Sequence, residues 1–204
     1  METGSIAVPR RVVPFARPEQ APAVSNARLA MIVLIAGESM LFAGLIGAYL
    51  VFRLAARNWP PPDLPRLPLG LTAVNSVMLL ASIIPLSRAL RAARRYDRRR
   101  LARSVGQTAL LGGAFLFVQG IEWVRLVRHG LTLASGTYGA TFYVLIGCHG
   151  VHVLAAVTWL AVTALLARRG AFTAGRQAPL EMCAIYWYFV CGLWLVLFPL
   201  VYLS

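Results

Sequence analysis

The residue of clearest chemical interest is Glu38, because it stands inside a long apolar segment. Residues 29–52 would extend roughly 36 Å as a helix, which is enough to cross the ~30 Å hydrocarbon core of a bilayer. Glu38 would then lie roughly 14 Å along the helix, within the hydrocarbon region. An ionisable group there costs a few kcal/mol, at least ~2.5, unless it is paired, hydrated or protonated. Glu38 is therefore either a functional carboxylate or a structural hydrogen-bonding group facing another helix.

A second carboxylate, Glu122, stands in another apolar segment. Gln119, Glu122 and Trp123 have the spacing i, i+3, i+4, which places them on one face of a helix. Glu122 could pair with Arg125 or Arg128 along the same helix, or it could form a hydrogen bond to another helix. Either structural role is favoured over a chemical one.

Two histidines, His149 and His152, are three residues apart and share a helical face. Histidine pairs on a helix can bind metal, but a closed site needs further ligands, and the only other histidine is His129. Haem with two axial histidines needs them on opposite sides of the ring, which adjacent turns of one helix do not supply. Hydrogen bonding between helices is favoured, because Gly147 and Gly150 allow close approach.

Composition places these residues in a membrane protein. Of the 204 residues, 59% are hydrophobic and 13% are charged, and the mean hydropathy is +0.69. We predict an all-α bundle of five transmembrane helices in residues 28–204, preceded by a flexible cytoplasmic arm at 1–27. The four spans after the first cover residues 69–90, 105–127, 139–166 and 182–203. The second contains Asn75 and a proline, Pro85, that should kink it. The fifth follows Glu181, which suits the positive N-terminal end of a helix.

Arginine dominates the charge of the chain and predicts its orientation. The formal net charge is +13, and all twenty basic residues are arginine. With the amino terminus inside, the arm and the second and fourth connectors hold 15 of these arginines and leave 5 outside. The positive-inside rule therefore predicts a cytoplasmic amino terminus and a periplasmic carboxyl terminus. Placement between spans explains this charge better than nucleic-acid binding does.

The densest basic cluster lies in the second connector. Anionic lipid headgroups could add roughly 1 kcal/mol for each arginine at the membrane surface. The predicted headgroup patch consists of Arg94, Arg95, Arg98, Arg99 and Arg100. A solvated cluster that only sets the topology is the alternative. The three cysteines form no CxxC or Cys/His ligand pattern.

Seven stretches, in order along nearly the whole chain, resemble the subunit III family of haem-copper terminal oxidases. They are Gly37-Glu38-Ser39 within residues 37–44, Trp59-Pro60-Pro61, Asn75-Ser76 within 75–82, Gln119 with Glu122-Trp123, residues 138–142, Cys148-His149-Gly150-Val151-His152 within 147–153, and Glu181 with Tyr186-Trp187. The family usually has Trp-His-Phe-Val-Asp in its last helix, whereas this chain has Tyr188 and Cys191 at the His and Asp positions.

The resemblance implies the short, five-helix form of a non-redox subunit in a bacterial inner membrane. It implies packing against catalytic subunit I, with subunit II and other respiratory subunits as further partners. Haem and copper would lie in those partners, with no metal or cofactor in this chain other than bound phospholipid in a cleft. The family is linked to proton uptake, protection from turnover damage and oxygen entry, and Glu38 matches its carbodiimide-reactive carboxylate. Asn75, Gln119, Glu122, His149, His152 and Glu181 are predicted to form an interhelical polar network.

Three other functions stay open from the residues. An accessory subunit of a nitric oxide reductase or a quinol oxidase would keep the fold and change the complex. A stand-alone proton-coupled transporter could use Glu38 and Glu122 as a relay. A haem-binding electron carrier would need the histidines as ligands.

Overall fold

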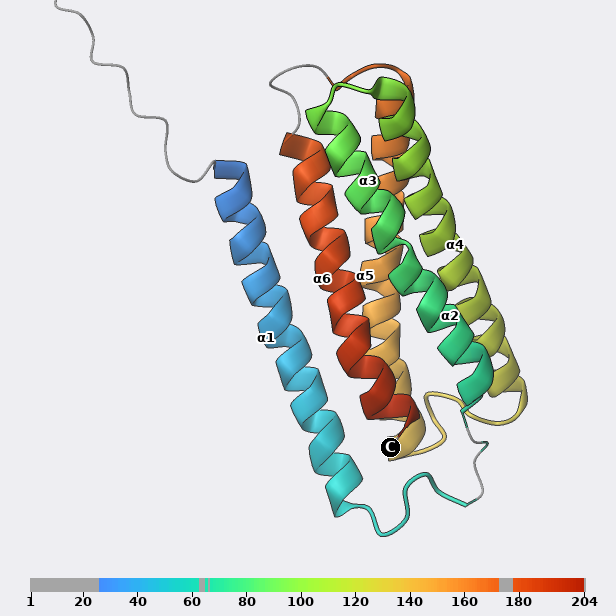
Figure 1. Ribbon diagram of the computed structural model, residues 1–204. Coiled ribbons are helices and arrows are strands. Elements are labelled where there is room, and N and C mark those ends of the chain that lie inside the picture. The colour runs from blue at the N-terminus through green and yellow to red at the C-terminus, as the bar shows by residue number, and fades with distance from the viewer. Residues whose placement is uncertain (1–25, 63–64, 66, 173–177, 204) are drawn as a thin grey trace, which may run out of the picture.

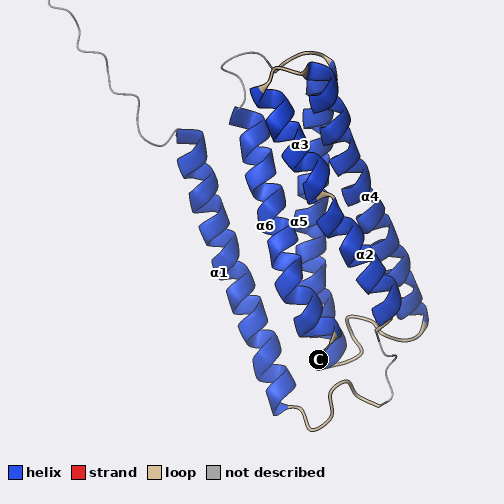
Figure 2. Ribbon diagram, viewed as in Figure 1, coloured by secondary structure: helices blue, strands red, loops and turns tan. Residues whose placement is uncertain are grey.

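The computed structural model describes residues 26–62, 65, 67–172 and 178–203 as a bundle of helices (Figures 1 and 2). The helices are α1 (Asn26–Ala55), α2 (Leu69–Ala81), α3 (Ile83–Arg94), α4 (Arg98–Arg128), α5 (Thr137–Arg168) and α6 (Ala178–Tyr202). Taking α2 and α3 as one broken span, five helices are long and apolar enough to cross a membrane, so the predicted fold class is confirmed. Most of the predicted cytoplasmic arm, residues 1–25, lies outside the described residues.

Helices extend beyond the apolar runs that predict them. The largest extension is in α4, which begins at Arg98 although its apolar run begins at residue 105. Arginine has a high helix propensity, and Asp97 caps the helix by accepting a hydrogen bond from Arg100 N at 3.0 Å. The basic turns are therefore continuous with the membrane helices.

The second span is interrupted at Ser82, three residues before Pro85. Proline has no backbone N–H, and its ring clashes with the carbonyl four residues earlier, which is that of Ala81. The buried Ser82 hydroxyl donates to Leu79 O and accepts from Trp187 Nε1 at 3.0 Å. The predicted kink is thus present, and α6 provides a partner at the break.

The helix α1 lies at the edge of the bundle, beside α6 (Figure 1). Among the described helices it packs against α5 and α6 only, whereas α4 contacts α2, α3 and α5. Only three of its residues, Met31, Phe42 and Tyr49, are buried. At its carboxyl-terminal end, Tyr49 contacts the ring of Trp59 edge to face, and Trp59 contacts Tyr138 in the same way.

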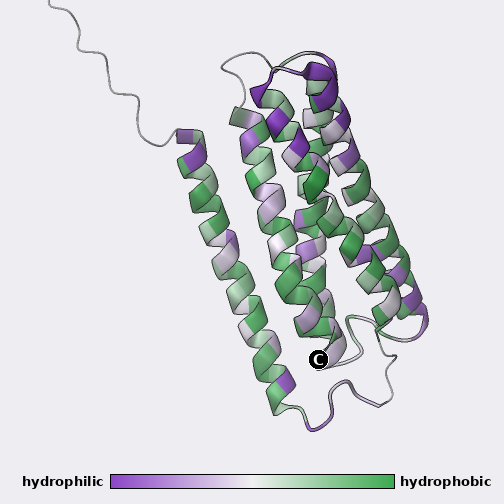
Figure 3. Ribbon diagram, viewed as in Figure 1, coloured by the Kyte–Doolittle hydropathy of each residue, from purple (hydrophilic) through white to green (hydrophobic). Residues whose placement is uncertain are grey.

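Hydropathy follows the bundle axis (Figure 3). Apolar ribbon fills the middle of the helices, and hydrophilic ribbon gathers where α3 turns into α4. Many large apolar side chains are exposed, including Met40 at 77% and Leu110 at 72%. Such a surface suits lipid or other membrane subunits, because apolar side chains make no hydrogen bonds that water would have to supply.

Candidate functional site

Glu38 of α1 forms its closest contact with His152 of α5. Glu38 Oε2 lies 2.7 Å from His152 Nε2, and the two side chains are 22% and 13% exposed. Phe42 lies one turn after Glu38 on the same face of α1. Its ring lies edge to face against the His152 imidazole, with the ring centres 5.1 Å apart. The contact therefore joins α1 to α5 in the middle of the apolar region.

The other ring nitrogen of His152 fixes the chemistry of this contact. His152 Nδ1 lies 2.7 Å from Cys148 O, one turn earlier in α5. A carbonyl oxygen only accepts, so Nδ1 carries a hydrogen. The bond to Glu38 then requires a further proton, which sits on the carboxyl group of Glu38 or on Nε2 of His152. The pair thus shares one proton and is neutral overall, as a protonated acid with imidazole or as a carboxylate with imidazolium.

His149, one turn from His152, has a different environment. Its ring is 1% exposed and stacks on Trp194 at 5.0 Å with an interplanar angle of 22°. Neither ring nitrogen has a hydrogen-bond partner among the described residues. The hydrogen bond to another helix that we expected of His149 is therefore not seen, because aromatic packing fills that face of α5.

These contacts also show whether the two histidines could bind a metal ion or a haem. Among the described residues, no three His, Cys, Asp or Glu side chains gather as metal ligands do. The Nε2 atom of His152 is occupied by Glu38, and the ring of His149 lies between Trp194 and Phe42. This donor set does not fit a haem or a metal ion at the histidine pair.

A second group of polar contacts joins α4 to its neighbours. Thr72 Oγ1 of α2 lies 2.7 Å from Glu122 Oε1 and 2.9 Å from Pro68 O at the N-cap of its own helix. Glu122 therefore bonds to another helix and not to Arg125 or Arg128. Gln119 Nε2 donates to the Tyr202 hydroxyl of α6 at 3.2 Å. Asn75 Nδ2 donates to Phe115 O at 3.1 Å. Each of these side chains from α2 and α4 also has one buried oxygen without a hydrogen-bond partner among the described residues. These oxygens are Asn75 Oδ1, Gln119 Oε1 and Glu122 Oε2.

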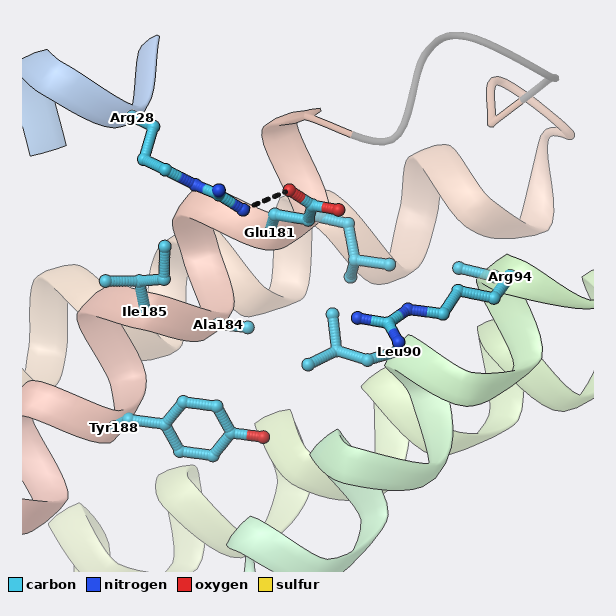
Figure 4. A pocket seen from close by; sticks show the side chains of 9 residues that line it. Arg28, Leu90, Arg94, Glu181, Ala184, Ile185 and Tyr188 are labelled. Atoms are coloured by element: carbon cyan, nitrogen blue, oxygen red, sulfur yellow. Dashed lines mark hydrogen bonds and ion pairs between the residues drawn. The ribbon is translucent and has the colours of Figure 1, made fainter. Parts of the chain in front are cut away.

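Glu181 lies near the start of α6 and faces Arg28 of α1 (Figure 4). The Arg28 Nη2 to Glu181 Oε2 distance is 3.5 Å, and the two side chains are 53% and 39% exposed. An exposed pair of this kind contributes at most ~1 kcal/mol. Both residues line a cavity of about 150 Å³ that also includes Arg94 of α3 and Tyr188 of α6.

Tyr188 and Cys191, which stand where the family usually has His and Asp, have different surroundings. The Ser87 hydroxyl donates to Ile83 O at 2.9 Å, so the Tyr188 hydroxyl, 3.2 Å away, is the donor to Ser87 Oγ. This bond joins α6 to α3 and is a polar contact that the sequence did not predict. Cys191 is fully buried and packs as a small core residue.

The five arginines of the predicted headgroup patch do not lie together, because they point in different directions around the helices. Arg95 and Arg100 line a cavity between α3 and α4, whereas Arg94 lines the separate cavity near Glu181. Arg98 and Arg99 are exposed in the first turn of α4 and line neither cavity.

The sequence also did not predict the interhelical contacts of three hydroxyl residues, Thr72, Ser82 and Ser87. Hydroxyls are common on membrane helices, and only the packing shows which ones form hydrogen bonds between helices.

Comparison with known proteins gives a consistent result over most of the chain. The family model described as cytochrome c oxidase subunit III matches residues 17–204. A protein named cytochrome c oxidase subunit 3 from the cyanobacterium Synechocystis is 35% identical over 174 residues, which cover 85% of this chain and 73% of the relative.

Fish proteins with the same name are similarly related. That of Gadus morhua is 34% identical over 187 residues, covering 89% of this chain and 70% of the relative. That of Oncorhynchus mykiss is 33% identical with the same coverage. With the five spans and a family match to all of them, this chain belongs to the cytochrome c oxidase subunit III family.

Proposed function

We propose that this chain is the non-redox accessory subunit of a haem-copper oxidase of the cytochrome c oxidase type. The match of residues 17–204 to the family model carries this proposal, and it favours this function over the alternatives from the sequence. The relatives compared above are named as subunits of that oxidase. The reaction with oxygen would take place at haem and copper in partner chains.

The chemical role that we assign to the chain rests on Glu38 and His152. The two residues hold one transferable proton between Glu38 Oε2 and His152 Nε2, which lie 2.7 Å apart. Moving that proton between oxygen and nitrogen changes the charge separation and leaves the pair neutral. Such a pair can exchange protons without leaving a lone charge in the membrane. This supports a role in sustaining proton uptake by the catalytic subunit, with oxygen access as a further role.

The partners follow from the same assignment. Subunit I would pack against the apolar surface of the bundle, and subunit II and other respiratory subunits would complete the complex. We place the chain in a bacterial inner membrane with its amino terminus in the cytoplasm, as the arginine distribution favours. Phospholipid would fill a cleft between the helices, and the predicted patch of arginines would attract anionic headgroups.

The transporter alternative loses its main support. A relay would need Glu38 and Glu122 to communicate, but Glu38 bonds to α5 and Glu122 bonds to α2. In the part of the chain that the structure describes, α1 and α4 form no direct packing contact. No continuous polar path joins the two carboxyl groups through these contacts.

Purification of the tagged chain from its native membrane tests the proposed function. Mass spectrometry of the co-purifying chains and the visible spectrum of the complex should identify a cytochrome c oxidase catalytic subunit with bound haem. The chain expressed alone should have a featureless visible spectrum. Recovery of a nitric oxide reductase or quinol oxidase catalytic chain, or of this chain alone without haem, would overturn the proposal.

A further inference from the structure

A second site lies apart from Glu38, in a cavity of about 670 Å³ between α3 and α4. Its charged lining consists of Arg88, Arg91, Arg95, Asp97, Arg100 and Arg103. The spacing explains why they converge. Arg88, Arg91 and Arg95 follow i, i+3, i+7 along one face of α3, and Arg100 and Arg103 are three apart in α4.

The positive charge in this cavity is largely uncompensated. Asp97, the single acidic residue of the lining, is already engaged by Arg100, with Oδ1 accepting from the backbone N and Oδ2 3.2 Å from Nε. Within the described residues, the side chains of Arg88, Arg95 and Arg103 have no hydrogen bond or ion pair. Five guanidinium groups therefore face one carboxylate across a cavity wide enough for a ligand.

The position of the cavity suggests the source of the missing negative charge. It lies where α3 turns into α4, at the hydrophilic end of two membrane helices (Figure 3), which is the level of lipid phosphates. Guanidinium groups bind phosphate oxygens in a bidentate manner, and basic pockets between membrane helices suit anionic headgroups. We propose that the cavity between α3 and α4 is a specific binding site for phosphate groups, such as those of an anionic phospholipid headgroup. The site does not depend on the role of Glu38.

This site differs from the patch predicted from the sequence. Two of the patch residues, Arg95 and Arg100, belong to it, whereas Arg98 and Arg99 do not. The difference provides a matched pair of variants with the same loss of charge. Arg88→Gln/Arg103→Gln removes one unpaired arginine from each wall, and Arg98→Gln/Arg99→Gln removes two exposed arginines just outside.

Native mass spectrometry of the full chain in detergent, titrated with cardiolipin, measures the site directly. At roughly 1 kcal/mol for each arginine, Arg88→Gln/Arg103→Gln should weaken binding by about 10- to 30-fold. Arg98→Gln/Arg99→Gln should change binding by less than about threefold, because diffuse attraction is screened by salt. Equal weakening by both double variants, or by neither, would overturn the proposal.

Two further arms make the result decisive. Gln107→Arg adds a positive charge to the cavity lining one turn beyond Arg103, and it should tighten cardiolipin binding. This variant serves as the test if the double variant fails to fold. Unchanged cardiolipin binding to folded Gln107→Arg would then overturn the proposal. Inorganic phosphate, added as a competitor at constant ionic strength, separates the sources. Displacement of cardiolipin by phosphate identifies a site for free phosphate, and resistance to displacement identifies a site for the lipid. Either result supports phosphate recognition if cardiolipin binding itself is weakened in Arg88→Gln/Arg103→Gln.

Discussion

At the scale of single residues, the neutral pair of Glu38 and His152 explains how a carboxyl group persists in a membrane helix. An isolated carboxylate at that depth costs a few kcal/mol, at least ~2.5. With one proton shared over 2.7 Å, neither partner is a lone charge, and His152 Nδ1 is held by Cys148 O. The imidazole is therefore oriented for proton exchange with Glu38.

Thr72 and Glu122 allow a test of the second polar contact. Thr72→Val removes the hydroxyl that is hydrogen-bonded to the buried Glu122 carboxyl and leaves the carboxyl oxygen without that partner. We expect the free energy of unfolding of the purified protein to fall by about 1–3 kcal/mol. Thermal unfolding in detergent would measure this loss.

Thr158→Val is the matched control for that change. The Thr158 hydroxyl is exposed and, among the described residues, bonds only to Leu154 O of its own helix, at 2.8 Å. Its loss should shift the unfolding temperature little. If both threonine variants lose the same stability, the contact between α2 and α4 has no special weight.

At the scale of the helices, Gly112 shows how closely α4 packs against α5 and against the Trp187 side chain of α6. A Cβ atom at Gly112 would lie 2.8 Å from Val157 Cγ2 of α5 and closer still, 2.5 Å, to Trp187 Cη2 of α6. The Trp187 indole is itself fixed by its bond to Ser82 at the break in the second span. The ring has little freedom to move away, so a larger residue at 112 must displace a helix.

The neighbouring glycines provide a controlled prediction. Gly112→Ala should destabilise the protein by about 1–3 kcal/mol through overpacking. A Cβ at Gly113 meets nothing within 4 Å, so Gly113→Ala should be neutral or slightly stabilising, because alanine favours the helix. Thermal unfolding of the two variants side by side tests the packing, and equal stabilities would show that this interface is looser than described.

The elements themselves follow from hydropathy, but their contacts do not. Five apolar runs and Pro85 are enough to predict five spans and the kink in the second. A face such as that of His149 and His152 can also be predicted, since it depends only on helical spacing. Which residue each face meets depends on the rotation and tilt of the other helices, so Trp194 beside His149 could not be foreseen.

At the scale of the whole molecule, α1 is held to the bundle at three levels. Arg28 faces Glu181 near its start, Glu38 bonds to His152 in its middle, and the Tyr49 hydroxyl donates to Leu200 O at 3.3 Å near its end. The first of these is exposed and weak, so the middle contact is the main polar link between α1 and α5. A change in the proton shared at Glu38 therefore acts on the helix that is least buried.

The orientation of the whole chain is also testable. Arg99 lies just after the α3–α4 turn and Leu133 between α4 and α5, and both are exposed. A membrane-impermeant maleimide applied to intact spheroplasts should label Leu133→Cys and should label Arg99→Cys only after the membrane is opened. The reverse pattern would invert the topology that the arginines predict.

The measurement that tests the central claim most directly compares oxidase complexes that contain Glu38→Gln and Glu181→Gln. Glutamine keeps the size of the side chain but cannot carry an acid proton, and Glu181 is an exposed carboxylate that makes the same substitution a control. Proton uptake and the number of turnovers before inactivation should both fall in the Glu38→Gln complex and stay at the wild-type level in the Glu181→Gln complex. Unaltered proton uptake and turnover lifetime in an intact Glu38→Gln complex would contradict the role assigned to the Glu38–His152 pair.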